Sequence, residues 1–182
     1  MPVINGLNTE KLLDIVDAVK QNWETGKTVW TASARWVEGF RVETESRGFK
    51  VQADEPDMLA GTNTAANPVE LVLQAYGACL AIGYAMNAAV RGIRIQDLRI
   101  DVEGEIDLPG FLGLEPPANV HMDRLPGYKN VTVRVKIKAD ADRKTLQELH
   151  DHVVRTSPVG VTISRPVKIE TELEVLQELS AA

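Results

Sequence analysis

The chain has 182 residues, of which 44% are hydrophobic and 25% charged, as expected for one soluble globular domain. Its 26 acidic and 20 basic residues give a net charge of −6, which argues against nucleic acid or an anionic membrane as the main partner, because both require a basic surface. The single cysteine excludes an internal disulfide and any zinc site built from several thiolates.

Two further segment types are not expected. We find no apolar run approaching the ~20 residues that span a bilayer. The first residues, Met-Pro-Val-Ile-Asn, lack the basic and apolar segments of an export signal. We therefore expect no membrane partner and a cytoplasmic location, where reducing conditions suit a lone cysteine.

The first predicted element is a helix over residues 8–22, because its apolar residues recur with helical spacing. Asn8 or Thr9 can serve as its N-cap, and Gly26 ends the segment. We expect residues 1–26 to form an N-terminal helical extension and residues 27–182 to form the main domain.

Three strands are predicted next, because apolar and polar residues alternate over 29–36, 40–44 and 49–53. The pairs Glu38-Gly39 and Arg47-Gly48 separate these runs as turns. The pattern indicates a three-stranded antiparallel meander.

A long helix is predicted from Pro68 to Arg91. Asn67 can cap it, Pro68 suits its first position, and Glu70 stands where a capping box places its acid. Gly92 closes it. Because the helix is apolar nearly all round, we expect it to be buried on most of its faces.

The remaining predicted elements are two strands, a helix and a last strand, over residues 93–106, 131–138, 142–157 and 167–175. The alternation in the first of these strands slips phase near Gln96-Asp97. The Pro- and Gly-rich loop 107–128 is unusually long, so we expect it to line a site or a subunit contact. The strands cluster as hairpins, which predicts an α+β fold with antiparallel sheet.

Histidine offers little support for a metal site. His150 and His152 are two residues apart on a predicted helix, ~200° apart around its axis, and cannot bind one ion together. His121 lies in the loop. We expect no metal and no cofactor.

Cys79 is the one residue with redox or nucleophilic capacity. It is either a small buried hydrophobe or a reactive thiolate, which a nearby cation or donor must stabilise. The candidate cations are distant in sequence: Arg35, Arg41, Arg155 and Arg165. Glu70 is half a turn out of phase with Cys79 and ~13 Å along the helix, which favours a capping role.

The segments Gly61-Thr62-Asn63-Thr64, Asn67-Pro68-Val69-Glu70-Leu71 and Tyr76-Gly77-Ala78-Cys79-Leu80 resemble the OsmC/Ohr family of osmotically inducible and organic hydroperoxide resistance proteins. Further along, Arg155-Thr156-Ser157-Pro158-Val159 and Ile163-Ser164-Arg165-Pro166-Val167 resemble its second motif. The loop residues 109–114 and 126–128 are similar to an OsmC-like branch. The resemblance covers roughly residues 28–176.

This resemblance implies antiparallel sheets around a long cysteine-bearing helix, in an intertwined homodimer with sites at the subunit interface. It also implies a thiol peroxidase without metal or flavin. A cysteine thiolate attacks the O–O bond of an organic hydroperoxide or H₂O₂, and a second cysteine captures the resulting sulfenic acid. An arginine held by a glutamate keeps the attacking thiol ionised.

Carried over by position, the attacking cysteine is Cys79. The resolving position falls on Ser157, which cannot form a disulfide. The family's glutamate lands on Val69, with Glu70 adjacent, and its arginine is best matched by Arg41, with Arg35 as an alternative.

Three functional hypotheses follow. The first is a one-cysteine peroxidase that an external thiol, such as a dihydrolipoyl group, glutathione or a partner protein, reduces. The second is a non-catalytic protein that binds a small apolar or thiol-bearing ligand in an interface pocket walled by Trp30, Trp36, Phe111 or Tyr128. The third is a structural or regulatory role suggested by the N-terminal helix.

Overall fold

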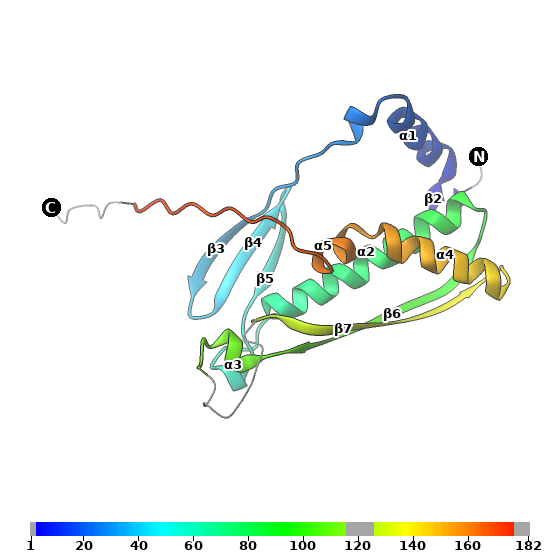
Figure 1. Cartoon of the computed structure of the whole chain (residues 1–182). Helices are drawn as coiled ribbons and strands as arrows, with labels where there is room; N and C mark the ends of the chain where they lie inside the picture. The colour runs from blue at the N-terminus through cyan, green and yellow to red at the C-terminus, as the bar shows by residue number, and fades with distance from the viewer. Residues whose placement is uncertain (1–2, 116–125, 177–182) are drawn as a thin grey trace.

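The computed structural model describes residues 3–115 and 126–176 (Figure 1). Its helices are α1 (Thr9–Gln21), α2 (Pro68–Val90), α3 (Leu108–Phe111), α4 (Arg143–Thr156) and α5 (Pro158–Ile163), with 3₁₀ turns η1 (Trp23–Gly26) and η2 (Asp57–Leu59). Its strands are β1 (Val3–Ile4), β2 (Leu7–Asn8), β3 (Ser33–Glu38), β4 (Arg41–Ser46), β5 (Phe49–Ala53), β6 (Ile95–Ile106) and β7 (Tyr128–Ala139).

The N-terminal segment holds the expected helix and an unexpected hairpin. Asn8 caps α1 by accepting from the backbone N–H of Lys11, as predicted. Before it, β1 and β2 pair through an Asn5-Gly6 turn in which both residues have positive φ. The Asn5 side chain donates to the carbonyl of Ile93 and accepts from the N–H of Ile95, at 3.0 and 2.9 Å. The hairpin is thereby fastened to the junction between α2 and β6. The division of the chain after residue 26 stays a prediction.

The three-stranded meander is confirmed as the antiparallel sheet β3-β4-β5. Its first strand begins at Ser33, so residues 29–32 are irregular instead of extending it. This sheet projects to one side of the helices (Figure 1), and large apolar side chains on it, including Trp36, Phe49 and Val51, are exposed.

The long helix is confirmed as α2. Its start has both bonds of the capping box between Asn67 and Glu70, with Pro68 in the first turn, and Gly92 follows its end with φ +76°. The expectation of burial on most faces is wrong for a single chain: Ile82 is 70% exposed, and Val72, Met86 and Val90 are exposed on the same stripe. Only Leu80, Tyr84, Ala88 and Ala89 of the helix are buried.

By length and composition, α2 is also apolar enough to cross a membrane, contrary to the expectation that no such run exists. The polar groups of Gln74, Tyr76 and Asn87 interrupt the apolar sequence of this helix, so it does not read as one continuous apolar run. In the structure α2 is the central helix of the fold, and α4 and the β6–β7 hairpin both lie along it (Figure 1).

The core lies between α2, α4 and the β6–β7 hairpin. Buried side chains from α2, from α4 and from the α2–β6 corner meet there, namely Leu80, Tyr84, Ala88, Ile93, Leu149 and Val153. The predicted phase slip is confirmed as a shift of the β6–β7 register between Ile95 and Asp97. Ile100, Val133 and Val135, on the inner face of the hairpin, therefore pack against this core.

The last third of the chain differs from expectation in two places. Asp142 caps α4 as predicted, but Ser157-Pro158 begins a further short helix, α5, because Ser157 acts as its N-cap and Pro158 as its first residue. The strand expected over 167–175 is wrong: the segment is irregular and pairs with no strand of the described chain. Ile169 and Leu173 are more than four-fifths exposed, because a strand forms only beside a neighbour and residues 3–115 and 126–176 supply none there.

Candidate functional site

Cys79 lies at the wall of an apolar cavity of about 480 Å³ between α2 and the junction of α4 with α5. The lining residues come from these elements and are Ala75, Ala78, Cys79, Ile82, Gly83, Met86, Asn87, Val153, Thr156, Ser157 and Pro158. None of them is charged. Cys79 is half-buried, and the cavity lies along the same stripe of α2 that carries Ile82 and Met86.

Ser157 is the polar partner of the cysteine. Its Oγ lies 3.2 Å from Cys79 Sγ, and the serine is 4% exposed. The same Oγ accepts from the backbone N–H of Gly160 at 3.1 Å, as the N-cap of α5. Because that bond uses an oxygen lone pair, the hydroxyl proton is free to be donated to the sulfur. A donated O–H···S bond stabilises a thiolate.

Tyr76 supports this arrangement, and sequence reasoning missed it. A Cβ added to Gly160 would lie 2.8 Å from the Tyr76 ring, so glycine lets α5 approach α2 closely. Burial raises the pKa of Tyr76, and a negative charge on Cys79 raises it further, so its hydroxyl stays protonated. The signal available in the sequence is the spacing of three residues between Tyr76 and Cys79, which places both on adjoining parts of one helix face.

Glu70 does not line the Cys79 cavity. Its carboxylate accepts from the backbone N–H of Asn67, and its own N–H donates to the Asn67 side chain, both at 2.9 Å. Within one chain it therefore acts as the capping acid. Beside it, the Tyr128 hydroxyl donates to the carbonyl of Val69 at 2.7 Å, joining β7 to the first turn of α2.

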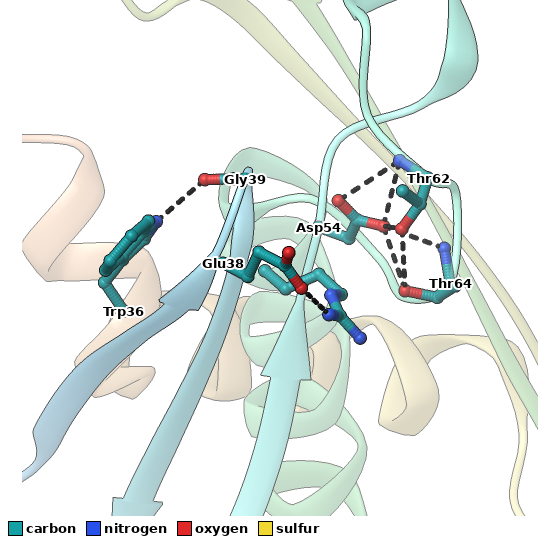
Figure 2. A network of polar contacts seen from close by, with 7 residues as sticks. Trp36, Glu38, Gly39, Asp54, Thr62 and Thr64 are labelled. Carbon is teal, nitrogen blue, oxygen red and sulfur yellow. Dashed lines mark hydrogen bonds and ion pairs between the residues drawn. The ribbon is translucent and has the colours of Figure 1, made fainter.

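The two arginines of the resemblance lie on the projecting sheet. Arg41 is paired with Glu38 at 2.7 Å (Figure 2), and Arg35 lies 3.9 Å from Glu43. Both arginines line one cavity of about 250 Å³ on this sheet. A hydrogen bond from Lys50 is the main cause of a lowered pKa of Glu43, with Arg35 adding to it. In a single chain neither arginine lines the Cys79 cavity.

The four aromatic residues expected to wall a pocket do not meet around Cys79 in one chain. Trp30 and Trp36 are exposed on and near the projecting sheet, and the Trp36 indole N–H donates to the carbonyl of Gly39 (Figure 2). Phe111 lines a small apolar cavity at the start of α2 instead. Part of the loop 107–128 forms α3, and residues 116–125 lie outside the described residues, His121 among them.

A buried carboxylate holds the loop that precedes α2. Asp54 is 1% exposed and accepts from the backbone N–H and the hydroxyl of both Thr62 and Thr64 (Figure 2). These bonds, the Thr62 hydroxyl first, hold the pKa of Asp54 far below its usual range. The loop so fixed leads directly to Asn67. The only local sign of this clamp is an acid, Asp54, followed eight residues later by Thr62-Asn63-Thr64.

Among the described residues there is no cluster of three or more His, Cys, Asp or Glu that could hold a metal ion. His150 instead contacts the Tyr84 hydroxyl through Nδ1. The pKa of His152 is lowered by burial and by the nearby charges of Arg91 and Arg155.

Comparison with known proteins identifies the family. The sequence profile of the OsmC-like protein family matches residues 61–172, which contain both Cys79 and Ser157. The chain belongs to the OsmC-like family. None of the curated proteins compared with it matches.

Solved structures of OsmC-like proteins share the fold. An OsmC-like protein from Mycoplasma pneumoniae is 18% identical with a TM-score of 0.62, over 76% of this chain and 89% of that one. An organic hydroperoxide resistance protein OsmC from Legionella pneumophila is 21% identical with a TM-score of 0.54, over 75% and 89%. An OsmC-like protein of unknown function from Vibrio cholerae is 11% identical with a TM-score of 0.58, over 75% and 94%. At these identities the likeness concerns the fold of this OsmC-like chain.

Proposed function

We propose that this OsmC-like protein is a one-cysteine thiol peroxidase that reduces organic hydroperoxides or H₂O₂ with an external thiol. The observation that carries the proposal is the contact between Cys79 Sγ and a hydroxyl that can donate to it, at the wall of an apolar cavity. Its apolar lining favours the hydrocarbon part of an organic hydroperoxide over the small polar H₂O₂.

The reaction balances without a metal or flavin. The Cys79 thiolate attacks one peroxide oxygen, the O–O bond breaks, and the alkoxide leaves and takes a proton, forming an alcohol and Cys79 sulfenic acid. A first external thiol condenses with the sulfenic acid and releases water. A second thiol then breaks the mixed disulfide and restores Cys79. Ser157 cannot take the place of the first external thiol, because its oxygen forms no disulfide.

The proposal includes a homodimer that completes the site. The chain exposes 14460 Å² of surface, whereas a compact monomer of this mass exposes about 8,700 Å². In addition, the most apolar stretch of α2 is largely uncovered in one chain, because 11% of it is buried. A second copy would cover the α2 stripe and bring Arg41, or Arg35, to the sulfur from its projecting sheet. A lone cysteine that must be restored between turnovers suits the reducing cytoplasm.

The test follows consumption of tert-butyl hydroperoxide with dihydrolipoamide as reductant, and traps the sulfenic acid with dimedone for mass spectrometry. We expect wild-type turnover, a dimedone adduct on Cys79, and loss of both in Cys79→Ser. Arg41→Gln should slow the first step by roughly tenfold or more, as expected for a lost charge-assisted bond. Arg47→Gln, in the turn between β4 and β5 of that sheet, is the control.

A thiol that reacts no faster than free cysteine would overturn the peroxidase. The second candidate is then a non-catalytic protein that binds a small apolar or thiol-bearing ligand, favoured by the uncharged lining of the cavity. For that function, ligand affinity would be unchanged in Cys79→Ser.

A further inference from the structure

A second cavity, of about 470 Å³, lies between α4 and the β6–β7 hairpin. It shares no lining residue with the Cys79 cavity. Tyr84, its contribution from α2, is five residues after Cys79, which places the two side chains ~140° apart around the helix. The cavity is therefore a separate place in the molecule, and the proposed peroxidase makes no use of it.

One part of its lining is apolar. Val135 and Ile137 project from the inner face of β7, and Leu146 projects from α4. These three side chains form a surface on which a short hydrocarbon chain can pack. Burial of such a chain is favourable in proportion to its area.

The other part of the lining presents hydrogen-bond donors. The Tyr84 side chain is buried and its hydroxyl lies 2.5 Å from His150 Nδ1. Burial, with the charge of Asp151 adding to it, raises the pKa of Tyr84 to about 12, so the phenol keeps its proton. The protonated phenol can donate to Nδ1, and in the His150 tautomer that accepts this bond the ring proton is on Nε2. This second ring nitrogen is left as a donor for a ligand.

Arg143 adds a cation. Its guanidinium has no ion pair or hydrogen bond with another residue in the part of the chain that the structure describes. Arg143 lies seven residues, about two helical turns, before His150, and both residues line the cavity. The neighbouring Gln147 amide nitrogen is occupied, because it donates to Asp151 at 2.8 Å. No acidic side chain lines the cavity among the described residues. A guanidinium and an imidazole on one cavity wall, with no acidic side chain among the described lining residues, favour a carboxylate ligand.

We propose that this cavity binds a small aliphatic carboxylic acid, with its carboxylate on Arg143 and His150 and its hydrocarbon chain on Val135, Ile137 and Leu146. The site joins one charged recognition element to one apolar surface. A ligand that lacks either half loses part of the binding free energy.

Octanoate is the probe, and proton NMR of the histidine ring hydrogens is the readout, with the full-length protein. We expect the His150 resonance to shift and saturate as octanoate is added, while the His152 resonance, two residues along α4, stays in place. Octanol, which has the same chain without the charge, should bind about tenfold or more weakly. Arg143→Gln should weaken octanoate binding to a similar extent.

Lys144→Gln removes an exposed cation next to Arg143 and should leave the affinity unchanged, as should Cys79→Ser. The last variant separates this site from the proposed peroxidase, since it abolishes only the latter. The proposal is overturned if octanoate leaves His150 unshifted, if octanol binds as well, or if Arg143→Gln binds octanoate as tightly as the wild type does.

Discussion

At the scale of single residues, the Ser157 hydroxyl makes two contacts at once, one with Gly160 and one with Cys79. It accepts from Gly160 to begin α5 and can donate to Cys79, so the start of a helix and the environment of the sulfur depend on one oxygen. The sequence predicts Cys79 and Ser157 as counterparts through the resemblance alone. Their contact across 78 positions of sequence depends on how α4 and α5 pack on α2, which local patterns do not encode.

Ser157→Cys should convert this contact into a disulfide. The Sγ–Oγ distance of 3.2 Å leaves two sulfur atoms a small rotation away from bonding geometry. A mild oxidant should therefore consume both thiols of the variant. The free energy of unfolding of the oxidised form should exceed that of the reduced form by about 3–5 kcal/mol, as expected for a loop of this length. Thiol titration and intact mass measure the bond.

Ser164→Cys, at the exposed end of α5, is the control and should keep its thiols under the same treatment. Equal thiol loss in both variants, or none in Ser157→Cys, would show that residues 79 and 157 are not neighbours in solution.

At the scale of elements, α2 is positioned by the loop that leads into it. Asp54 accepts hydrogen bonds from Thr62 and Thr64. Gly61 lies so close to the backbone of Glu55 that a Cβ on residue 61 would clash with it. The capping box then begins the helix at a fixed place. The capping box is readable from Asn67-Pro68-Val69-Glu70, whereas the Asp54 clamp is a long-range contact with no periodic pattern.

Asp54→Asn should loosen this loop, because an amide offers its own N–H groups toward donors that need an acceptor. We expect the Thr62 and Thr64 amides to exchange roughly tenfold faster or more in hydrogen-exchange measurements. Because the folded-state pKa of Asp54 is depressed, the wild-type bonds stabilise the loop above about pH 4 and are lost only as the pH falls further. Asp57→Asn, an exposed acid in η2, is the control and should exchange like the wild type.

Two elements show where local patterns fail. The β1–β2 hairpin is too short for alternation to register, although Asn5-Gly6 is a recognised signal for a two-residue turn. Residues 167–175 carry the alternation of a strand but pair with no strand among the described residues. The first error comes from an overlooked turn, and the second from a pattern that has no partner strand in the described part of the chain.

At the scale of the whole molecule, one chain exposes more surface than a compact monomer of the same mass does. The α2 stripe, the projecting sheet and the C-terminal segment each expose large apolar side chains, Ile82, Trp36 and Ile169 among them. The proposed second copy would cover these side chains, in the way that obligate dimers cover their large apolar interfaces. Such a dimer would also account for the apolar pattern of α2.

Sedimentation equilibrium should give twice the 20.0 kDa of one chain. Ile82→Lys places a charge in the middle of the exposed stripe, and we expect it to dissociate or unfold the protein. Lys144→Glu, on the outer face of α4, should leave the mass unchanged. A wild-type protein that sediments as a stable single chain would remove the second copy from the proposed site.

The bonds of Asn5 bear on the order in which the polypeptide matures during synthesis. Asn5 leaves the ribosome well before Ile93 and Ile95, which follow 88 and 90 positions later. The N-terminal hairpin can therefore bind the α2–β6 corner only after that corner has left the ribosome. Formation of the Asn5 bonds is accordingly a late step of folding. A fluorescent reporter attached next to Asn5 would detect formation of these bonds and would not respond to the earlier collapse around Leu80.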